Sequence, residues 1–312
     1  MTDICIYCKS KNIVRFGRRK TLRRGSIQRH LCRQCRKTFS TDDGFKWKHY
    51  SKEKIVETIE FYVGGGNSLR FLAETLCLSK NTILRWVFEY VRMLQRFTNR
   101  LVPRIIQKVN LDELFLKMMS GFFYLWDAIC ADSRFAFFFF SETRKNKDAE
   151  ELIKQFRNAY LMVFDGAFQY PAVLKKMFGV WWYYHHTHRC KDFEDKKNNN
   201  LVERMQNFVR SKTHQRRGFK SLKTGRMQLQ ALFIYYNFVR VHSAIKTTPA
   251  EKPGVIEYWG QNTEKKRWLY LIEQASKIPV FYLMMESTVL WYKAGACESI
   301  IYFIFLGNNC IC

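Results

Sequence analysis

The stretch Lys108-Val-Asn-Leu-Asp-Glu-Leu-Phe-Leu-Lys117 is typical of a β-strand and marks the point where the chain changes from helical to strand patterns. Two aromatic-rich runs follow it after short turns, at 121–131 and 134–141. Runs of this kind, separated by turns, are typical of antiparallel strands. We therefore expect these three segments to form a meander that begins a sheet.

The following segments alternate between helical and strand patterns. A helical stretch at 148–160 precedes the short apolar strand Leu161-Met-Val-Phe-Asp165-Gly166, and a helix at 171–178 precedes a strand at 180–185. A further helix begins near Asn198. Strands that alternate with helices favour a mixed sheet with helices on both faces. The sequence predicts an α/β fold for this part of the chain.

The helix that begins near Asn198 has one apolar and one polar side. Its apolar side is formed by Leu201, Val202, Met205, Phe208 and Val209. Its polar side carries Glu203, Gln206, Asn207 and Arg210. The i, i+3, i+4 and i+7 spacing places the second set on one face. Taken alone, this pattern indicates an ordinary amphipathic helix with a solvated polar face.

Three acidic residues of these elements form a candidate cluster. Asp112 lies within the first strand, Asp165 at the end of the fourth, and Glu203 on the helix. If the first and fourth strands are neighbours, the two aspartates meet and the helix can bring Glu203 over them. Clustered carboxylates repel one another, and oxygen ligands favour Mg²⁺ or Mn²⁺. Two such ions would support an in-line phosphoryl displacement.

Three other acidic residues lie near this cluster. Glu113 should point to the opposite face from Asp112, so we expect it to take no part. Asp127 and Asp132 compete with Asp112 as candidates, but they lie on the second strand and its turn.

Two further polar groups leave alternatives open. A loop near DNA and a second zinc site both explain the imidazoles of His185, His186 and His188, and we favour the loop. Capping of a buried helix end and contact with DNA both explain Asn237, Arg240 and His242.

Charge and composition indicate the class of partner. The chain has 312 residues and a formal net charge of +26, which indicates a polyanionic partner and nucleic acid first of all. We expect no signal peptide, because no basic n-region followed by an apolar h-region opens the sequence. We expect no membrane helix, since the longest uncharged run, 299–312, is too short to cross a bilayer. These features predict a cytoplasmic protein.

The N-terminal segment contains two CxxC pairs, Cys5-Ile-Tyr-Cys8 and Cys32-Arg-Gln-Cys35. Four thiolates at this spacing are suited to tetrahedral Zn²⁺. We expect a zinc ribbon over residues 1–40, with a basic hairpin between the pairs. A redox pair is less well supported, because the flanking strand and helix of such motifs are missing. The basic charge favours DNA over another subunit as the partner of the ribbon.

A helix-turn-helix is predicted within residues 48–100. After a helix at 51–63 and three glycines, the run 69–87 has a turn at Cys77-Leu78 and an N-cap at Ser79. The residues expected to face the major groove are Lys80, Asn81, Thr82 and Arg85. A plain helical hairpin is the alternative, because Cys77 occupies the turn position that usually prefers glycine.

The chain resembles DDE-type insertion-sequence transposases over about residues 107–253, and within them the branch named for insertion sequence six. The resemblance rests on Asp112, Asp165-Gly166 and Glu203, together with Arg217 to Arg226, Tyr235 to Ser243 and Thr248-Pro-Ala-Glu251. It implies an RNase H-like catalytic domain over 105–253 that binds two Mg²⁺ or Mn²⁺ ions through Asp112, Asp165 and Glu203. It also implies that Arg210 contacts DNA near the cleaved end.

The function implied is that of a prokaryotic transposase associated with the nucleoid. Such an enzyme binds the terminal inverted repeats of its element as a homodimer on double-stranded DNA, cuts, and joins the ends to target DNA. A decayed transposase that only binds DNA, and a structure-specific nuclease, are the alternatives. Residues 254–312 form a C-terminal extension beyond the resemblance. From about Leu269 its pattern is neither helical nor alternating, so we expect poor order there.

Overall fold

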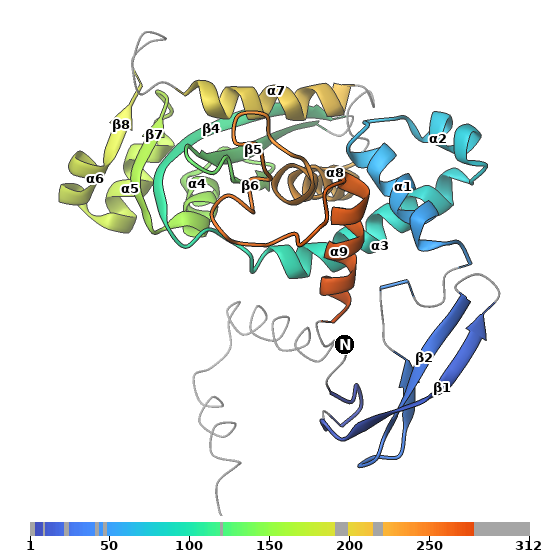
Figure 1. Ribbon diagram of the computed structural model, residues 1–312. Coiled ribbons are helices and arrows are strands. Elements are labelled where there is room, and N and C mark those ends of the chain that lie inside the picture. The colour runs from blue at the N-terminus through green and yellow to red at the C-terminus, as the bar shows by residue number, and fades with distance from the viewer. Residues whose placement is uncertain are drawn as a thin grey trace, which may run out of the picture. The chain divides into compact units, whose positions relative to one another are not determined.

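The computed structural model describes residues 4–8, 10–21, 25–40, 44–45, 49–118, 121–190, 199–214 and 221–277. The chain divides into two compact units, and each is described by itself. The described part of the first unit holds the N-terminal strands. The second unit, which ends at Ala275, holds the helices and a larger sheet (Figure 1).

The first unit is built around a three-stranded sheet. Its strands follow one another in the order β1 (Ile13–Thr21), β2 (Gly25–Cys32) and β3 (Thr38–Ser40). β2 and β3 are antiparallel, with His30 opposite Phe39. Among the described residues of this unit, Cys5, Cys32 and Phe39 are the ones buried together. Such a small apolar core is too little to stabilise a fold by itself, so the expected zinc ribbon needs its cysteines.

Three helices open the second unit: α1 (Lys52–Val63), α2 (Leu69–Leu76) and α3 (Lys80–Thr98). Each begins after a serine whose hydroxyl accepts a backbone N–H of the first turn, at Ser51, Ser68 and Ser79. Between α2 and α3 the backbone of Cys77 is left-handed, with φ 52° and ψ 49°. The turn therefore has the conformation that glycine would adopt more easily.

The five-stranded sheet of the second unit has the order β6-β5-β4-β7-β8. Its strands are β4 (Ile106–Met118), β5 (Gly121–Cys130), β6 (Ala136–Ser141), β7 (Ala159–Phe164) and β8 (Thr187–Arg189). β4, β5 and β6 are antiparallel neighbours, whereas β7 is parallel to both β4 and β8. This mixed sheet, with helices packed on it, confirms the α/β class.

Helices cover both faces of this sheet. Leu114 and Leu116 of β4 pack with Val202 of α7 (Asn200–His214) and Leu229 of α8 (Leu222–Ile234). On the other face, Val109 and Leu111 share a core with α4 (Asn146–Ile153) and α5 (Gln169–Phe178). Because side chains alternate along a strand, Asp112 belongs to the α7 side.

Two predicted boundaries in this region are wrong. The helix expected at 148–160 ends at Ile153, followed by a short 3-10 turn, η1 (Lys154–Phe156), and strand β7. The strand expected at 180–185 is the helix α6 (Val180–His186). Its aromatic residues have high strand propensity, but they repeat at helical spacing, and Trp181 stacks on His185 four residues later.

The segment after α8 continues as a π-helix, η2 (Tyr235–Val239), and the chain later forms α9 (Glu264–Ser276). The expected lack of helical regularity from Leu269 is therefore wrong as far as Ser276. Trp268, Leu271, Ile272 and Ala275 lie at i, i+3, i+4 and i+7 and are buried in the core that α1 to α3 share with the sheet. Residues 278–312 lie outside the described residues.

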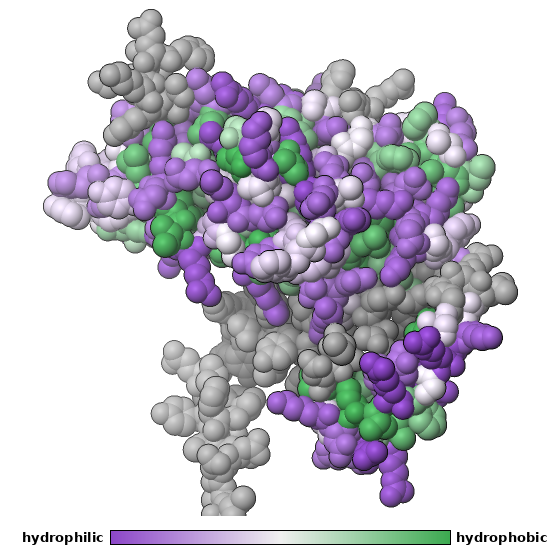
Figure 2. All heavy atoms as spheres, viewed as in Figure 1, coloured by the Kyte–Doolittle hydropathy of each residue, from purple (hydrophilic) through white to green (hydrophobic). Residues whose placement is uncertain are grey.

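The surface of the described helices and sheet is mainly hydrophilic on the face drawn in Figure 2. Among the described residues, no helix combines the length and the apolar character needed to cross a bilayer.

Candidate active site

The parallel pairing of β4 with β7 brings Asp112 and Asp165 together. The last paired residues are Leu111 and Phe164, so the next residue of each strand is an aspartate. Carboxylate oxygens of Asp112, Glu113 and Asp165 all lie within 4.8 Å of one another. The expectation that Glu113 lies away from Asp112 is therefore wrong. Its strand parity places it on the other face, where it pairs with Arg144, but its side chain is long enough to reach the pair.

Glu203 lies on the first turn of α7 and is exposed. It is not a member of the 4.8 Å group, yet its charge acts on Asp112 and contributes to raising the pKa of that carboxyl. Arg210, two turns further along α7, acts on Asp112 in the opposite direction. The helix thus places Glu203 and Arg210 on the side of the sheet that Asp112 faces.

The ionisation of Asp112 is strongly perturbed. Burial first, and the neighbouring charge of Asp165 second, raise its pKa from 3.8 to about 7. Gln206 opposes this shift by donating a hydrogen bond to the ionised form. In this buried and negatively charged environment, a bound cation would stabilise the ionised carboxylate in place of the proton.

Asp127 is a further buried carboxyl, which the sequence analysis considered only as a competitor of Asp112. It lies directly opposite Asp112 in the antiparallel register and is fully buried. Gln206 Nε2 donates to both aspartates, at 3.1 Å to Asp112 Oδ2 and 3.1 Å to Asp127 Oδ1. Burial, with the charge of Asp112 next, raises the pKa of Asp127 well above its ordinary value. The register of β4 and β5 was needed to find this neighbour.

A buried pair of amides fixes the start of α7 on β4. Asn199 Nδ2 donates to the Leu111 carbonyl at 2.8 Å, and Asn110 Nδ2 donates to Asn199 Oδ1 at 3.1 Å. Both asparagines are buried. Leu111 directly precedes Asp112, so these bonds join the residue before the first carboxylate to the residue just before the helix that carries Glu203.

The backbone beside Asp165 is also held in place. Asp165 Oδ1 accepts the N–H of Ala167 at 3.0 Å, which forms a tight turn after β7. Arg189, opposite Phe164 on β8, extends its guanidinium to the Gly166 carbonyl at 3.4 Å. A cationic group therefore lies beside the residue that follows Asp165. No pattern in the sequence indicated this position for Arg189.

The donor set fits a divalent cation of the Mg²⁺ class. All candidate ligands are carboxylate oxygens, which such ions prefer. Glu113 Oε2 of this group and Oδ2 of the neighbouring Asp127 are buried and lack a hydrogen-bond partner among the described residues. Buried carboxylate oxygens without partners are costly, so a nearby cation would satisfy a need that the protein leaves open.

Part of the chain that contains these carboxylates is similar to known proteins. Residues 106–242 match a family model described as a DDE domain. The transposase for insertion sequence element IS257 in transposon Tn4003 of Staphylococcus aureus is 26% identical over 132 residues, which are 39% of this chain and 59% of that protein. Residues 106–242 are thus similar to a DDE domain, and the named relative is a transposase. These residues are here called the DDE domain.

Two further relatives extend the comparison. The transposase for insertion sequence-like element IS431mec of Staphylococcus aureus strain Mu50 is 26% identical over the same share of each chain. An uncharacterized protein in transposable element ISH50 of Halobacterium salinarum is 25% identical over 36% of each chain. The alignments with the staphylococcal transposases span 59% of their length.

Two integrase core domains are among the solved structures that match part of this chain. The HTLV-2 integrase catalytic core domain in complex with magnesium has 13% identity and a TM-score of 0.33, covering 48% of this chain and 99% of that one. The catalytic core domain of BIV integrase has 14% identity and a TM-score of 0.36, covering 46% and 91%.

The four N-terminal cysteines form a second candidate metal site, outside the DDE domain. Their sulfurs all lie within 4.8 Å of one another, with Cys5 Sγ 3.7 Å from Cys35 Sγ and Cys8 Sγ 3.4 Å from Cys32 Sγ. The clustering of four thiols suits tetrahedral Zn²⁺.

The helices that precede the DDE domain carry the predicted DNA-reading residues. Lys80, Asn81 and Arg85 are exposed on the first turns of α3, and Thr82 is half-buried. Thr82 N–H donates to Ser79 Oγ at 3.0 Å, as the predicted N-cap requires. Ile83 and Trp86 are buried on the opposite side.

The remaining candidates are the polar residues after α8 and the three histidines near α6. Asn237 is buried and pairs with both backbone groups of Ala136, at 2.8 Å each, which favours the structural alternative for this residue. Arg240 lies over the ring of Phe208 at 4.8 Å. No metal cluster among the described residues includes His185, His186 or His188.

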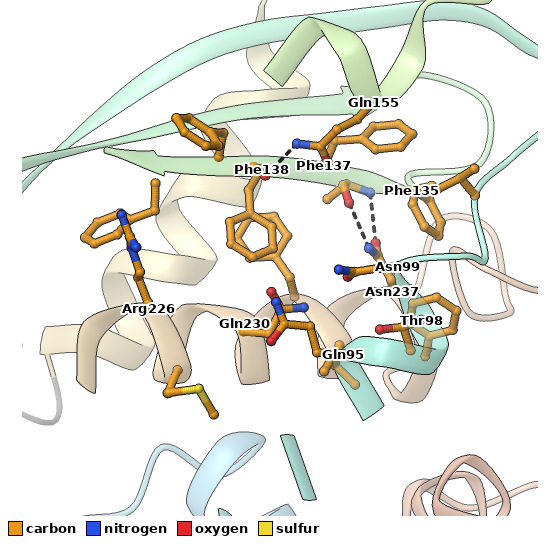
Figure 3. Close-up of a pocket in the computed structure, with 18 residues that line it drawn as sticks. Gln95, Thr98, Asn99, Phe135, Phe137, Phe138, Gln155, Arg226, Gln230 and Asn237 are labelled. Carbon is orange, nitrogen blue, oxygen red and sulfur yellow. Dashed lines mark hydrogen bonds between the residues drawn. The ribbon is translucent and has the colours of Figure 1, made fainter. Parts of the chain in front are cut away.

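A cavity of about 670 Å³ lies apart from the carboxylates, between α3, β6 and α8 (Figure 3). Its lining includes Phe137 to Phe140 of β6 and Phe233 of α8. Gln155 Nε2 donates to the Phe138 carbonyl at 2.9 Å, and Asn237 pairs with Ala136, so side chains already occupy the outer edge of β6 at these two residues. An added strand would find these edge groups taken.

Proposed function

We propose that the protein is a transposase that binds the terminal inverted repeats of an insertion sequence and catalyses metal-dependent DNA cleavage and strand transfer. The observation that carries this proposal is the meeting of Asp112 and Asp165 at the end of β7 within a DDE domain, with Glu203 on the adjoining helix.

In this proposal Asp112, Asp165 and Glu203 hold two Mg²⁺ or Mn²⁺ ions. When bound, such ions activate the attacking oxygen and stabilise the leaving oxygen of an in-line displacement at phosphorus. Gln206 orients the carboxylate of Asp112 by its hydrogen bond. Arg210, on the polar side of α7, is exposed and suited to a DNA phosphate near the cleaved bond.

The modules ahead of the DDE domain are assigned to recognition of the DNA ends. The exposed face of α3, with Lys80, Asn81, Thr82 and Arg85, is proposed to enter the major groove. The cysteine cluster is proposed to hold a structural Zn²⁺, and its basic hairpin to contact phosphates. The net charge of +26 supports both assignments.

Joining two element ends to one target requires two sets of carboxylates, so we propose that the protein acts as a homodimer on double-stranded DNA. Its place of action would be the DNA of a prokaryotic cytoplasm. A protein that binds DNA without catalysis is the main alternative. The juxtaposed carboxylates favour an enzyme over that alternative.

The test is cleavage and joining of labelled DNA that carries the element ends, in the presence of Mg²⁺ or Mn²⁺. The intact protein is compared with Asp165→Asn and Glu203→Gln. Metal-dependent joining that is lost in both variants, with end binding retained, supports the proposal. End binding without joining by the intact protein would instead support the non-catalytic alternative.

A further inference from the structure

Helix α6 presents two large aromatic side chains to solvent. Trp181 is 69% exposed and Tyr184 67% exposed. With His185 they lie at i, i+3 and i+4, so the three form one face, here called the aromatic face. Trp182 and Tyr183, which point the other way, pack against the core. The exposed rings are thus not needed to hold the helix in place.

The aromatic face is preorganised. The rings of Trp181 and His185 stack with centroids 4.2 Å apart and planes inclined by 22°. His185 Nδ1 lies 2.7 Å from the Trp181 carbonyl oxygen, which fixes the imidazole over the indole. Lys175 places its ammonium 4.8 Å from the ring centre of Tyr183 and 5.3 Å from that of Tyr184. Flat rings and a cation are therefore held side by side.

The surrounding charge favours an anionic ligand. From Gln169 to Arg189 the sequence contains no Asp or Glu, but it contains Lys175, Lys176 and Arg189 and three histidines. Lys176 pairs with Glu150, while Lys175 faces the tyrosines. Exposed aromatic rings flanked by cations are the means by which proteins bind single-stranded nucleic acid. A duplex offers these rings much less, because its bases are already stacked on both faces.

The aromatic face is joined to the carboxylates through β7 and β8. His186, at the end of α6, packs edge-on against Tyr160 at the start of β7, with ring centroids 4.8 Å apart. Asp165 follows the end of β7, and a strand rises about 3.3 Å per residue, so about 17 Å of strand separates the two positions. Arg189, beside Gly166, lies along the same edge.

We propose that the aromatic face binds unpaired DNA, with bases stacked on Trp181 and Tyr184 and phosphates near Lys175. The evidence for a stacking site comes from the residues of α6 and does not depend on the proposed function. Its use, to hold a strand that leaves the carboxylates, rests on the proposed function.

The test is fluorescence anisotropy of a short labelled oligothymidylate with the full chain, in buffer without added Mg²⁺. The double variant Trp181→Ala/Tyr184→Ala should bind about ten-fold more weakly or worse, since both aromatic rings on which bases would stack are removed. Trp259→Ala is the matched control, because Trp259 is 78% exposed but lies outside α6. It should change the affinity less than two-fold, by about 0.4 kcal/mol at most. Circular dichroism checks that each variant is folded.

Equal affinity of the folded double variant and the intact chain would overturn the proposal. So would an equal loss in Trp259→Ala, because the effect would then not belong to α6. Sedimentation velocity tests whether a second copy of the chain binds the aromatic face instead. Self-association that is lost in the double variant, with oligothymidylate affinity unchanged, would assign the face to that second copy. Joining assays run in parallel distinguish the two proposals. If the double variant loses single-strand affinity but the intact chain joins no DNA, the transposase activity is refuted and the stacking site is still supported.

Discussion

Gln206 Nε2 donates a hydrogen bond of 3.1 Å to Asp112, and it donates a second, also of 3.1 Å, to Asp127 on the neighbouring strand. One amide of α7 thereby orients a candidate metal ligand and satisfies one oxygen, Oδ1, of the fully buried Asp127 carboxyl. The helix and the sheet are fastened at the point where the chemistry is proposed to occur.

Replacing this amide should weaken the fold. Gln206→Met keeps the volume but removes both donors, and leaving a buried acceptor without a partner costs about 1–3 kcal/mol. We expect the free energy of unfolding in urea to fall by that amount. Asn207→Ala, a change at an exposed neighbour on the same helix, should alter it by about 0.5 kcal/mol at most. Equal effects of the two substitutions would show that the bridge does not contribute.

The raised pKa of Asp112 predicts a pH dependence. Its pKa of about 7 in the folded chain lies above the ordinary 3.8, so between these values the folded chain binds more protons than the unfolded chain. In the absence of metal, the contribution of Asp112 to stability is therefore fully present at low pH and is lost as the pH rises through about 7.

Protons and Mg²⁺ should compete at this carboxyl. We expect the rise in melting temperature caused by Mg²⁺ to be larger at about pH 8 than at about pH 6, because ligands must be deprotonated to bind metal. Asp112→Asn should remove most of this rise at both pH values. A rise that is the same in the variant would place the ion elsewhere.

The cysteine cluster predicts a bound metal that can be counted. Purified protein should contain about one zinc ion per chain, and Cys8→Ser should lower this content. Cys77→Ser is the matched control, since Cys77 is exposed and lies outside the cluster. Chelation should also expose the hairpin of β1 and β2 to proteolysis, because this unit buries so few apolar side chains. Full protection after removal of zinc would contradict this.

The left-handed Cys77 predicts a stabilising substitution. A non-glycine residue with φ 52° is strained, and glycine adopts this conformation without a steric penalty. Cys77→Gly should raise the free energy of unfolding by about 0.5–1 kcal/mol, despite the greater entropy of glycine in the unfolded chain. Chemical denaturation measures the difference, and a loss of stability would show that the thiol makes a contact worth more than the strain.

The sequence allowed the proximity of Asp112 and Asp165 to be predicted, because it depends only on regular strand pairing. Asp112 and Asp165 each end a run of buried residues, and the parallel pairing of their strands brings them together. Gln206 was placed on the correct face of its helix by the same kind of periodicity. Its second partner, Asp127, depends on the register between β4 and β5, which no local pattern determines.

Other features depend on tertiary contacts that a linear pattern does not contain. Glu113 was assigned by strand alternation, which describes where a side chain starts but not how far it reaches. Residues 180–185 were read as a strand from their aromatic content, whereas stacking at helical spacing determines their conformation. The helix α9 was missed because its apolar residues are interrupted by charged ones that remain at the surface, although its buried face packs on the core.

The most direct test of the central claim is the rate of strand joining in Mg²⁺ for Asp112→Asn, measured against Asp132→Asn. Asp132 is an exposed aspartate of the same domain, so this control changes the same chemical group away from the cluster. Asp112→Asn should lower the rate by about a thousand-fold, as loss of several kcal/mol of transition-state stabilisation requires. The joining rate of Asp132→Asn, and the binding of DNA ends by both variants, should stay close to those of the intact protein. Joining by Asp112→Asn at the rate of the control would contradict the assignment of Asp112 and Asp165 as the catalytic pair.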